Sequence, residues 1–127
     1  MKKWIIGSLI TVVLFSLFLS GCGVKAHTDP AQIINASVNK EFTIALGSNI
    51  TTGYSWQPKY DTNALTLVGN EYKPNDTTGK VVGAMGTEYF HFKAINTGSS
   101  QISFTYYRPW EAPKSEDKTA KFNIVIK

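Results

Sequence analysis

Apolar and polar residues alternate in twos along most of the chain from Lys40 to the C-terminus. A period of two places successive side chains on opposite faces of a β-strand, so each run predicts a strand with one buried face. Glycine, asparagine and proline separate the runs, and no segment after residue 22 combines a helical apolar period with capping residues. The residues expected to share a face are Phe42, Ile44 and Leu46; Tyr54, Trp56 and Pro58; Leu65 and Leu67; Phe90, Phe92 and Ala94; Ile102, Phe104 and Tyr106; and Phe122, Ile124 and Ile126.

Six or seven short strands within about 90 residues are typical of two packed sheets. The sequence therefore predicts an all-β fold, a single immunoglobulin-like β-sandwich, with a small closed barrel as the alternative. Trp56 on the second expected strand suits the aromatic core of such a sandwich, although the paired cysteines of antibody domains are absent. The residues that we expect to be mostly buried are Phe42, Ile44, Trp56, Phe92, Phe104 and Ile124.

Residues 1–21 predict a secretory signal peptide. Two lysines form a basic start, residues 4–19 carry no charge, and small residues follow before Cys22. The stretch from Leu19 to Cys22 resembles a bacterial lipobox, which implies that Cys22 is acylated and becomes the first mature residue. The alternative is a retained membrane-spanning helix, which needs about 20 apolar residues. Both place the domain outside the cytoplasm, and the first predicts a lipid anchor on the outer face of a membrane in the bacterial cell envelope.

The remaining chain is expected to form one domain at residues 38–127, preceded by a lipid-anchored tether and lead-in at residues 22–37. Loss of the two lysines of the signal peptide lowers the formal net charge from +4 to +2. This mild charge, without a cluster of Lys and Arg, predicts no nucleic-acid partner. Cys22 is the only cysteine, so the mature domain has no internal disulfide and depends on packing for its stability.

Residues capable of catalysis are sparse. Of the two histidines, His27 falls in the tether, and His91 alternates with apolar neighbours and should point to solvent or across to another strand. A Ser-His-Asp site would need a hydroxyl and a carboxylate that converge on His91. The sequence therefore predicts a binding protein and not an enzyme, with no metal and no cofactor. The glutamates are scattered singly, which is typical of solvated strand faces and loops: Glu41, Glu71, Glu88 and Glu111.

Three connections between the expected strands are unusual in composition. The first, Asn49 to Tyr54, places two β-branched threonines before a glycine, and the second, Gly83 to Gly86, is rich in small residues. The third contains arginine and tryptophan, which are enriched in binding hot spots, on either side of a proline that fixes φ. Alternatively, the tryptophan packs on the rim of the sandwich and the arginine pairs with the glutamate that follows. The third connection begins with Arg108, Pro109, Trp110 and Glu111.

These connections resemble the three inhibitory loops of the chagasin-like inhibitors of papain-type cysteine proteases. The first family motif is Asn-Pro-Thr-Thr-Gly followed by Tyr or Phe, with tryptophan two residues on. The second is a glycine-rich segment before an aromatic strand, and it is matched loosely. The third is Arg-Pro-Trp and is present intact. The matching residues are Asn49, Thr51, Thr52, Gly53, Tyr54 and Trp56, with Ile50 in place of proline; Gly83, Ala84, Met85 and Gly86; and Arg108, Pro109 and Trp110.

The resemblance covers about Val38 to Lys127. It implies a monomer that occupies the cleft of a papain-like cysteine protease reversibly, without a covalent bond and without acting as a substrate. The first loop would be the central wedge, with Thr51 and Thr52 closest to the Cys-His pair, and Trp110 would pack on aromatic side chains beside it. The strands alone do not distinguish this function from the alternative, a lipid-anchored immunoglobulin-like adhesion or cell-envelope module.

Overall fold

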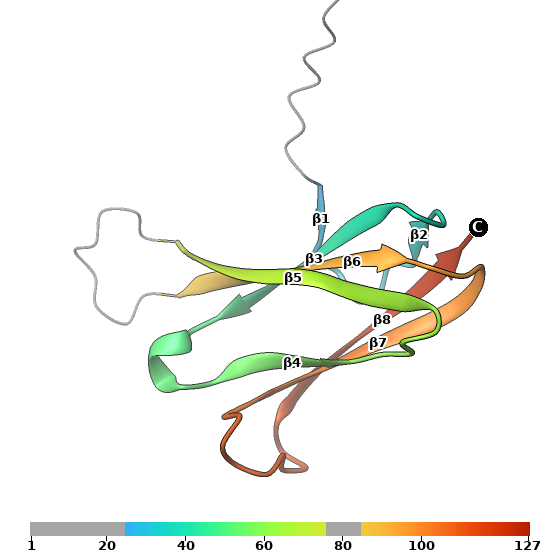
Figure 1. Ribbon diagram of the computed structural model, residues 1–127. Helices are drawn as coiled ribbons and strands as arrows, with labels where there is room; N and C mark the ends of the chain where they lie inside the picture. Colours follow the sequence, from blue (N-terminus) through green and yellow to red (C-terminus); the bar gives the residue numbers. More distant parts are fainter. Residues whose placement is uncertain (1–24, 76–84) are drawn as a thin grey trace, which may run out of the picture.

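Two four-stranded sheets pack face to face in the computed structural model, which describes residues 25–75 and 85–127 (Figure 1). The first sheet, called sheet A, has the order β1-β3-β6-β5, and the second, sheet B, has the order β2-β8-β7-β4. The strands of sheet A are β1 (Ala26–His27), β3 (Glu41–Ser48), β6 (Gly86–Ala94) and β5 (Leu65–Pro74). Those of sheet B are β2 (Ile34–Ala36), β8 (Lys118–Ile126), β7 (Gly98–Tyr107) and β4 (Ser55–Lys59).

The topology is that of an immunoglobulin-like sandwich, and it confirms the predicted fold class. The short strands β1 and β2 pair in parallel with β3 and β8. The remaining pairs, β3 with β6, β5 with β6, β4 with β7 and β7 with β8, are antiparallel. Because the strands form two separate sheets and not one closed sheet, the alternative of a small barrel was wrong.

The core lies between the sheets and is rich in phenylalanine. Phe104 of sheet B contacts Phe90 and Phe92 of sheet A, with ring centroids 4.9 and 6.3 Å apart, and it also meets Phe122 edge-on. Such edge and tilted contacts suit the charge distribution of aromatic rings. Five of the six residues predicted to be buried are so, and Trp56 is partly buried and packs against the core at one end.

Two short strands fall inside the segment that we expected to be a tether and lead-in. Ile34 and Ala36 of β2 point into the core and are buried, and β1 adds Ala26 and His27 to the edge of sheet A. Their period-2 pattern is too short to stand out in the sequence, and only pairing with β3 and β8 makes strands of them. The signal peptide and Cys22 lie outside the described residues.

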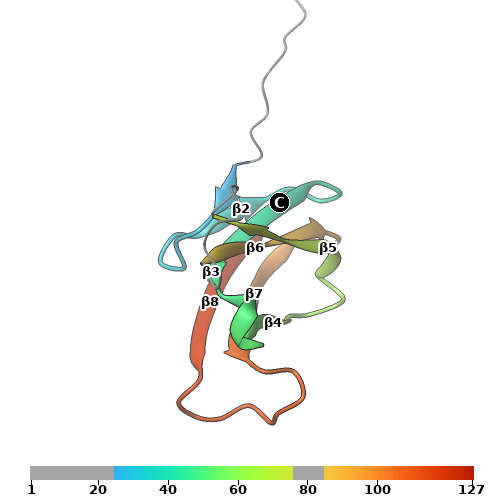
Figure 2. The same ribbon diagram turned by 90° about the vertical axis from the view of Figure 1, so that its left-hand side faces the viewer.

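The connections of interest leave the sheets at the same end of the sandwich (Figure 1 and Figure 2). The end of β3 lies opposite the start of β6, since Ser48 pairs with Gly86. In sheet B the start of β4 faces the end of β7, since Ser55 pairs with Tyr107. The start of β8 is at that end too, because Lys118 pairs with the residue before Tyr107. Antiparallel pairing thus brings together segments that are more than fifty residues apart in the sequence.

Candidate functional site

The first loop, Asn49 to Tyr54, contains a single turn of 3-10 helix, η1 (Ile50–Thr52). The Asn49 side chain caps this turn by accepting hydrogen bonds from the backbone N–H and the hydroxyl of Thr51. The Thr52 hydroxyl donates to the Asn49 carbonyl oxygen over 2.7 Å, and the Gly53 N–H donates to the Ile50 carbonyl oxygen over 3.0 Å. Both threonine hydroxyls therefore donate inward and stiffen the loop that contains them.

Gly53 ends the turn in the left-handed conformation, with φ of 83°. An L residue with a Cβ is strained there. A Cβ at this position would also lie 2.4 Å from the Cη2 atom of Trp110, which is closer than such atoms approach. The glycine thus serves two purposes, because it closes the first loop and lets the tryptophan of the third loop lie against it.

Aromatic side chains hold the first loop on the sandwich. Tyr106 of β7 accepts a hydrogen bond from the Asn49 N–H over 3.0 Å, and its ring contacts those of Tyr54 and Trp56. The Trp56 indole N–H donates to the Gly47 carbonyl oxygen over 2.9 Å. The residues before and after the loop are therefore joined to each other and to the neighbouring sheet.

The third loop is joined to the first by Arg108. Its Nε donates to the Thr52 carbonyl oxygen over 3.1 Å, and its guanidinium lies 4.8 Å from the centroid of the Tyr54 ring. A cation over an aromatic face is attracted to it. Arg108 also pairs with Glu111 at 3.6 Å. This pair was expected under the alternative in which Trp110 packs on the rim of the sandwich. Trp110, however, is 71% exposed and is not packed away on the rim.

The second loop is described only at its end. Gly83 and Ala84 lie outside the described residues. Met85 is 53% exposed, and its carbonyl oxygen accepts a hydrogen bond from Asn75, which extends the β5–β6 pairing. Gly86 was predicted to belong to this loop, whereas it is the buried first residue of β6. The Tyr72 side chain covers it so closely that a Cβ at Gly86 would lie 2.2 Å from the ring.

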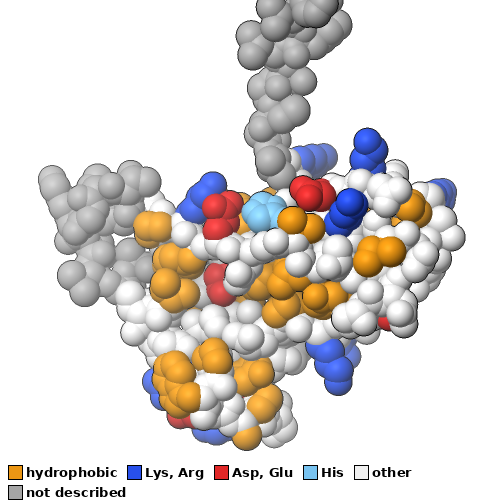
Figure 3. Space-filling model, in the orientation of Figure 1, with side chains coloured by type: hydrophobic (Ala, Val, Ile, Leu, Met, Phe, Trp, Pro, Cys, Tyr) orange, Lys and Arg blue, Asp and Glu red, His pale blue; other side chains and the backbone are white. Residues whose placement is uncertain are grey.

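Each loop contributes one large exposed apolar side chain at this end: Ile50 (43%), Met85 (53%) and Trp110 (71%). Figure 3 shows apolar side chains gathered at the lower left, over the connection between β7 and β8. An open hollow of about 610 Å³ lies among the loops. Asn49, Thr52, Met85 and Arg108 line it together with the aromatic residues Tyr54, Trp56 and Tyr106. The described residues of all three predicted loops therefore form one continuous surface.

Glu88 is a site residue that the sequence interpretation misplaced on a solvated face. It is 5% exposed, and its Oε2 accepts a hydrogen bond from the Trp56 N–H over 3.0 Å. The pKa of the Glu88 carboxyl is raised, because the effect of burial exceeds the opposing effects of the hydrogen bond from Trp56 and of the nearby Ser48 hydroxyl. The signal was present in the alternation itself, because Glu88 shares its parity with the inward-facing Phe90.

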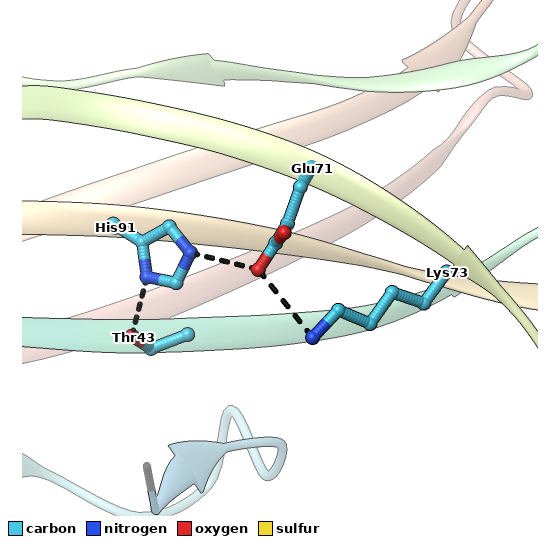
Figure 4. Close-up of polar contacts among 4 residues, drawn as sticks. All are labelled: Thr43, Glu71, Lys73 and His91. Atoms are coloured by element: carbon cyan, nitrogen blue, oxygen red, sulfur yellow. Dashed lines mark hydrogen bonds and ion pairs between the residues drawn. The ribbon is translucent and has the colours of Figure 1, made fainter.

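A hydroxyl and a carboxylate do converge on His91, on the outer face of sheet A (Figure 4). Thr43 Oγ1 lies 2.8 Å from His91 Nδ1, and Glu71 Oε1 lies 3.4 Å from His91 Nε2 and 3.7 Å from the Lys73 Nζ. His91 thus points across to neighbouring strands, as expected. Thr43 is only 4% exposed, and its hydroxyl contacts His91. The chain of contacts joins three strands of sheet A.

Other kinds of site are not found in the part of the chain described. Residues 25–75 and 85–127 contain no group of three or more His, Cys, Asp or Glu side chains placed to hold a metal ion. Across the same residues, no helix is long and apolar enough to cross a bilayer.

An immunoglobulin-like sandwich with stiff, apolar loops gathered at one end is typical of proteins that bind a partner through their loops. Comparison with known families is more specific: residues 35–126 match the model of the chagasin family of peptidase inhibitors, I42, and the chain belongs to this family.

Individual relatives are similar over most of the chain. Chagasin of Trypanosoma cruzi is 32% identical over 108 residues, which are 81% of this chain and 93% of chagasin. The structure of the cysteine protease inhibitor EhICP2 from Entamoeba histolytica has a TM-score of 0.64 at 27% identity, covering 80% of this chain and 88% of that one. The structure of PbICP-C in complex with falcipain-2 shares the fold, with a TM-score of 0.52 at 19% identity over 82% of this chain and 92% of that one.

Proposed function

We propose that this protein is a reversible, non-covalent inhibitor of papain-like cysteine proteases that blocks the active-site cleft with three loops. The observation that carries the proposal is the exposure of Ile50, Met85 and Trp110, one from each loop, at one end of the sandwich. Clustered exposed apolar side chains with a polar surround are typical of an interaction site. Membership of a family of peptidase inhibitors supports a protease as the partner.

The first loop acts as the wedge because it is already folded into its final form. The turn Ile50–Thr52 is closed by hydrogen bonds from Gly53 and by the Asn49 cap, so little backbone freedom is lost on docking. A 3-10 turn also differs from the extended backbone that a protease cleft holds for cleavage. The loop can therefore fill a cleft without presenting its own peptide bonds as a substrate.

The other two loops widen the contact. Trp110 lies against Gly53, so its exposed ring extends the surface of the wedge, and the exposed Met85 lines the hollow beside it. Thr51 and Thr52 form the exposed tip and meet the Cys-His pair of the protease through their methyl groups, since their hydroxyls donate inward. The inhibitor supplies no reacting group of its own and acts by excluding substrate.

The protein is further proposed to be a monomer that is lipid-anchored through Cys22 to the outer face of a bacterial membrane. The support is the sequence of the first 22 residues: a basic start, an uncharged apolar run and a lipobox-like end. Labelled palmitate should be incorporated into the wild-type protein and not into Cys22→Ala. If the wild-type protein takes up no label, the anchor is wrong. Light scattering of the chain from residue 23 onward should give the mass of a monomer.

The inhibitor itself is tested by titrating the chain from residue 23 onward against papain and a cathepsin-L-type enzyme. We expect competitive inhibition that is reversed by dilution, and recovery of the intact inhibitor afterwards. A chain that leaves both activities unchanged at high micromolar concentration would overturn the proposal in favour of the adhesion module. Cleavage within the first loop during inhibition would show a substrate and not a wedge.

A further inference from the structure

We propose that Glu88 is a positioning residue, which holds the inhibitory first loop in place by tying the start of β6 to the residues on either side of that loop. This inference rests on the proposed function, because it concerns the same site. Glu88 does not touch the partner, and it acts through Trp56.

The first observation is the placement of the Glu88 carboxylate between the two sheets. Glu88 belongs to sheet A, and the Trp56 N–H that it accepts, over 3.0 Å, belongs to β4 of sheet B. β4 is an edge strand, and its N–H groups that point away from β7 have no strand to bond with. The carboxylate satisfies one such group at the second residue of the strand, three residues after Gly53 ends the loop.

The second observation is that the same tryptophan is bound to the other side of the loop. The Trp56 indole donates to the carbonyl oxygen of Gly47, two residues before Asn49. Trp56 thus connects the residues before and after the first loop to Glu88, through its indole and its backbone N–H. Removing the carboxylate would free the N–H of Trp56 and loosen the base of the loop.

The third observation concerns the second loop. Glu88 lies three residues after Met85, on the strand that begins where that loop ends. The strand register places Gly86 opposite Ser48, immediately before Asn49. A contact at Glu88 therefore fixes the first loop relative to the second, which is the relation that a joint docking surface requires.

Burial of a carboxylate is unfavourable unless hydrogen bonds compensate for it. Burial raises the pKa of Glu88, and no ion pair to it is found within residues 25–75 and 85–127. Ser48 Oγ is buried beside it and lacks a partner of hydrogen-bonding geometry in the same part of the structure. An apolar residue here would join the phenylalanine core at less cost, so the polar group has a purpose other than packing.

Two substitutions separate positioning from packing. Glu88→Gln keeps an oxygen for the Trp56 N–H and offers its amide to Ser48, whereas Glu88→Leu keeps the bulk and leaves the partly buried N–H without an acceptor. Glu71→Leu, on the exposed outer face of the adjacent strand β5, is the matched control. Inhibition constants are measured against papain well below the thermal midpoint of each variant, together with amide hydrogen exchange.

We expect Glu88→Gln and Glu71→Leu to inhibit within about twofold of wild type, and Glu88→Leu to inhibit about tenfold more weakly, which is the usual scale for a buried donor left unsatisfied. In Glu88→Leu, the amides of Trp56 and of the first loop should exchange faster while those of β8 keep their protection. A general loss of stability would accelerate β8 as well.

Inhibition by Glu88→Leu at the wild-type level would overturn the inference, and so would a loss in Glu88→Gln as large as that in Glu88→Leu. Failure of the proposed function gives a different result, because wild type would then not inhibit at all. Amide exchange at Trp56 would still show whether Glu88 holds the first loop, since that measurement needs no protease.

Discussion

Trp110→Ala should weaken inhibition strongly while leaving the fold intact. Trp110 is 71% exposed, and a tryptophan side chain can bury up to about 250 Å². About 180 Å² is therefore available to a partner, worth about 4.5 kcal/mol if all of it were covered, at about 25 cal/mol per Å². If docking covers half, the loss is about 2 kcal/mol, or about thirtyfold in the inhibition constant.

The assay is inhibition of papain by wild type, Trp110→Ala and Trp110→Phe, with thermal unfolding of each. The phenylalanine variant should fall between the other two, because it retains part of the apolar surface. Ile33→Ala is the control: Ile33 is also exposed, at 59%, and it precedes β2 beside the far end of β8. This control should leave inhibition unchanged. The midpoints should differ little, since exposed substitutions alter stability by about 0.5 kcal/mol or less.

Two results would refute this reasoning. If Trp110→Ala inhibits as wild type does, the ring is not covered in the complex, and the third loop is not a contact. If inhibition is lost together with several degrees of thermal midpoint, Trp110 acts through its packing on Gly53 and stabilises the first loop from within.

Three further predictions concern the interior of the site. Gly53→Ala should lower the free energy of unfolding by about 1–2 kcal/mol in chemical denaturation, because an L residue is strained at a φ of 83°. It should also weaken inhibition, because the new Cβ displaces Trp110. An unchanged free energy of unfolding would exclude backbone strain at this position. Arg108→Ala should remove the bond to the Thr52 carbonyl oxygen and weaken inhibition by about 1 kcal/mol, whereas an effect on stability alone would contradict that coupling. Burial raises the pKa of Glu88 above 4.5, so the native state binds this proton more tightly than the unfolded chain does. The contribution of Glu88 to stability is therefore largest below about pH 4.5, and it falls as the pH rises through the pKa of the folded state. Glu88→Gln should flatten this part of the stability–pH curve, and an identical curve would show that another group is responsible.

Much of the fold could be predicted from the sequence because strand alternation is a local property. Phe42 and Ile44 face the core, as their period of two predicts. The loop residues were found from short motifs, and the structure brings the described parts of all three loops to one end. Alternation was less useful where a run is short, as in β2, and where a polar residue occupies an inward position, as Glu88 does.

The stiffness of the first loop was decided by contacts that no local pattern contains. The sequence has Ile50 where the resemblance implies proline, so the loop lacks the ring that would fix φ. The structure fixes it instead by the Asn49 cap, by the Tyr106 hydroxyl from β7 and by Arg108 from the third loop. The last two lie more than fifty residues away in the sequence, and only the sheet register brings them to Asn49 and Thr52.

The sequence alone thus determined which residues face inward and which segments form the loops, because side-chain alternation and turn chemistry depend on near neighbours. Tertiary structure decided which loops touch, that a glycine lies beneath Trp110, and that one glutamate is buried below the first loop. These relations depend on the order in which strands pair, and that order arises from packing two sheets around one core. In this protein, the strands and loops follow from the local sequence, whereas the arrangement of the loops at one end follows from the tertiary structure.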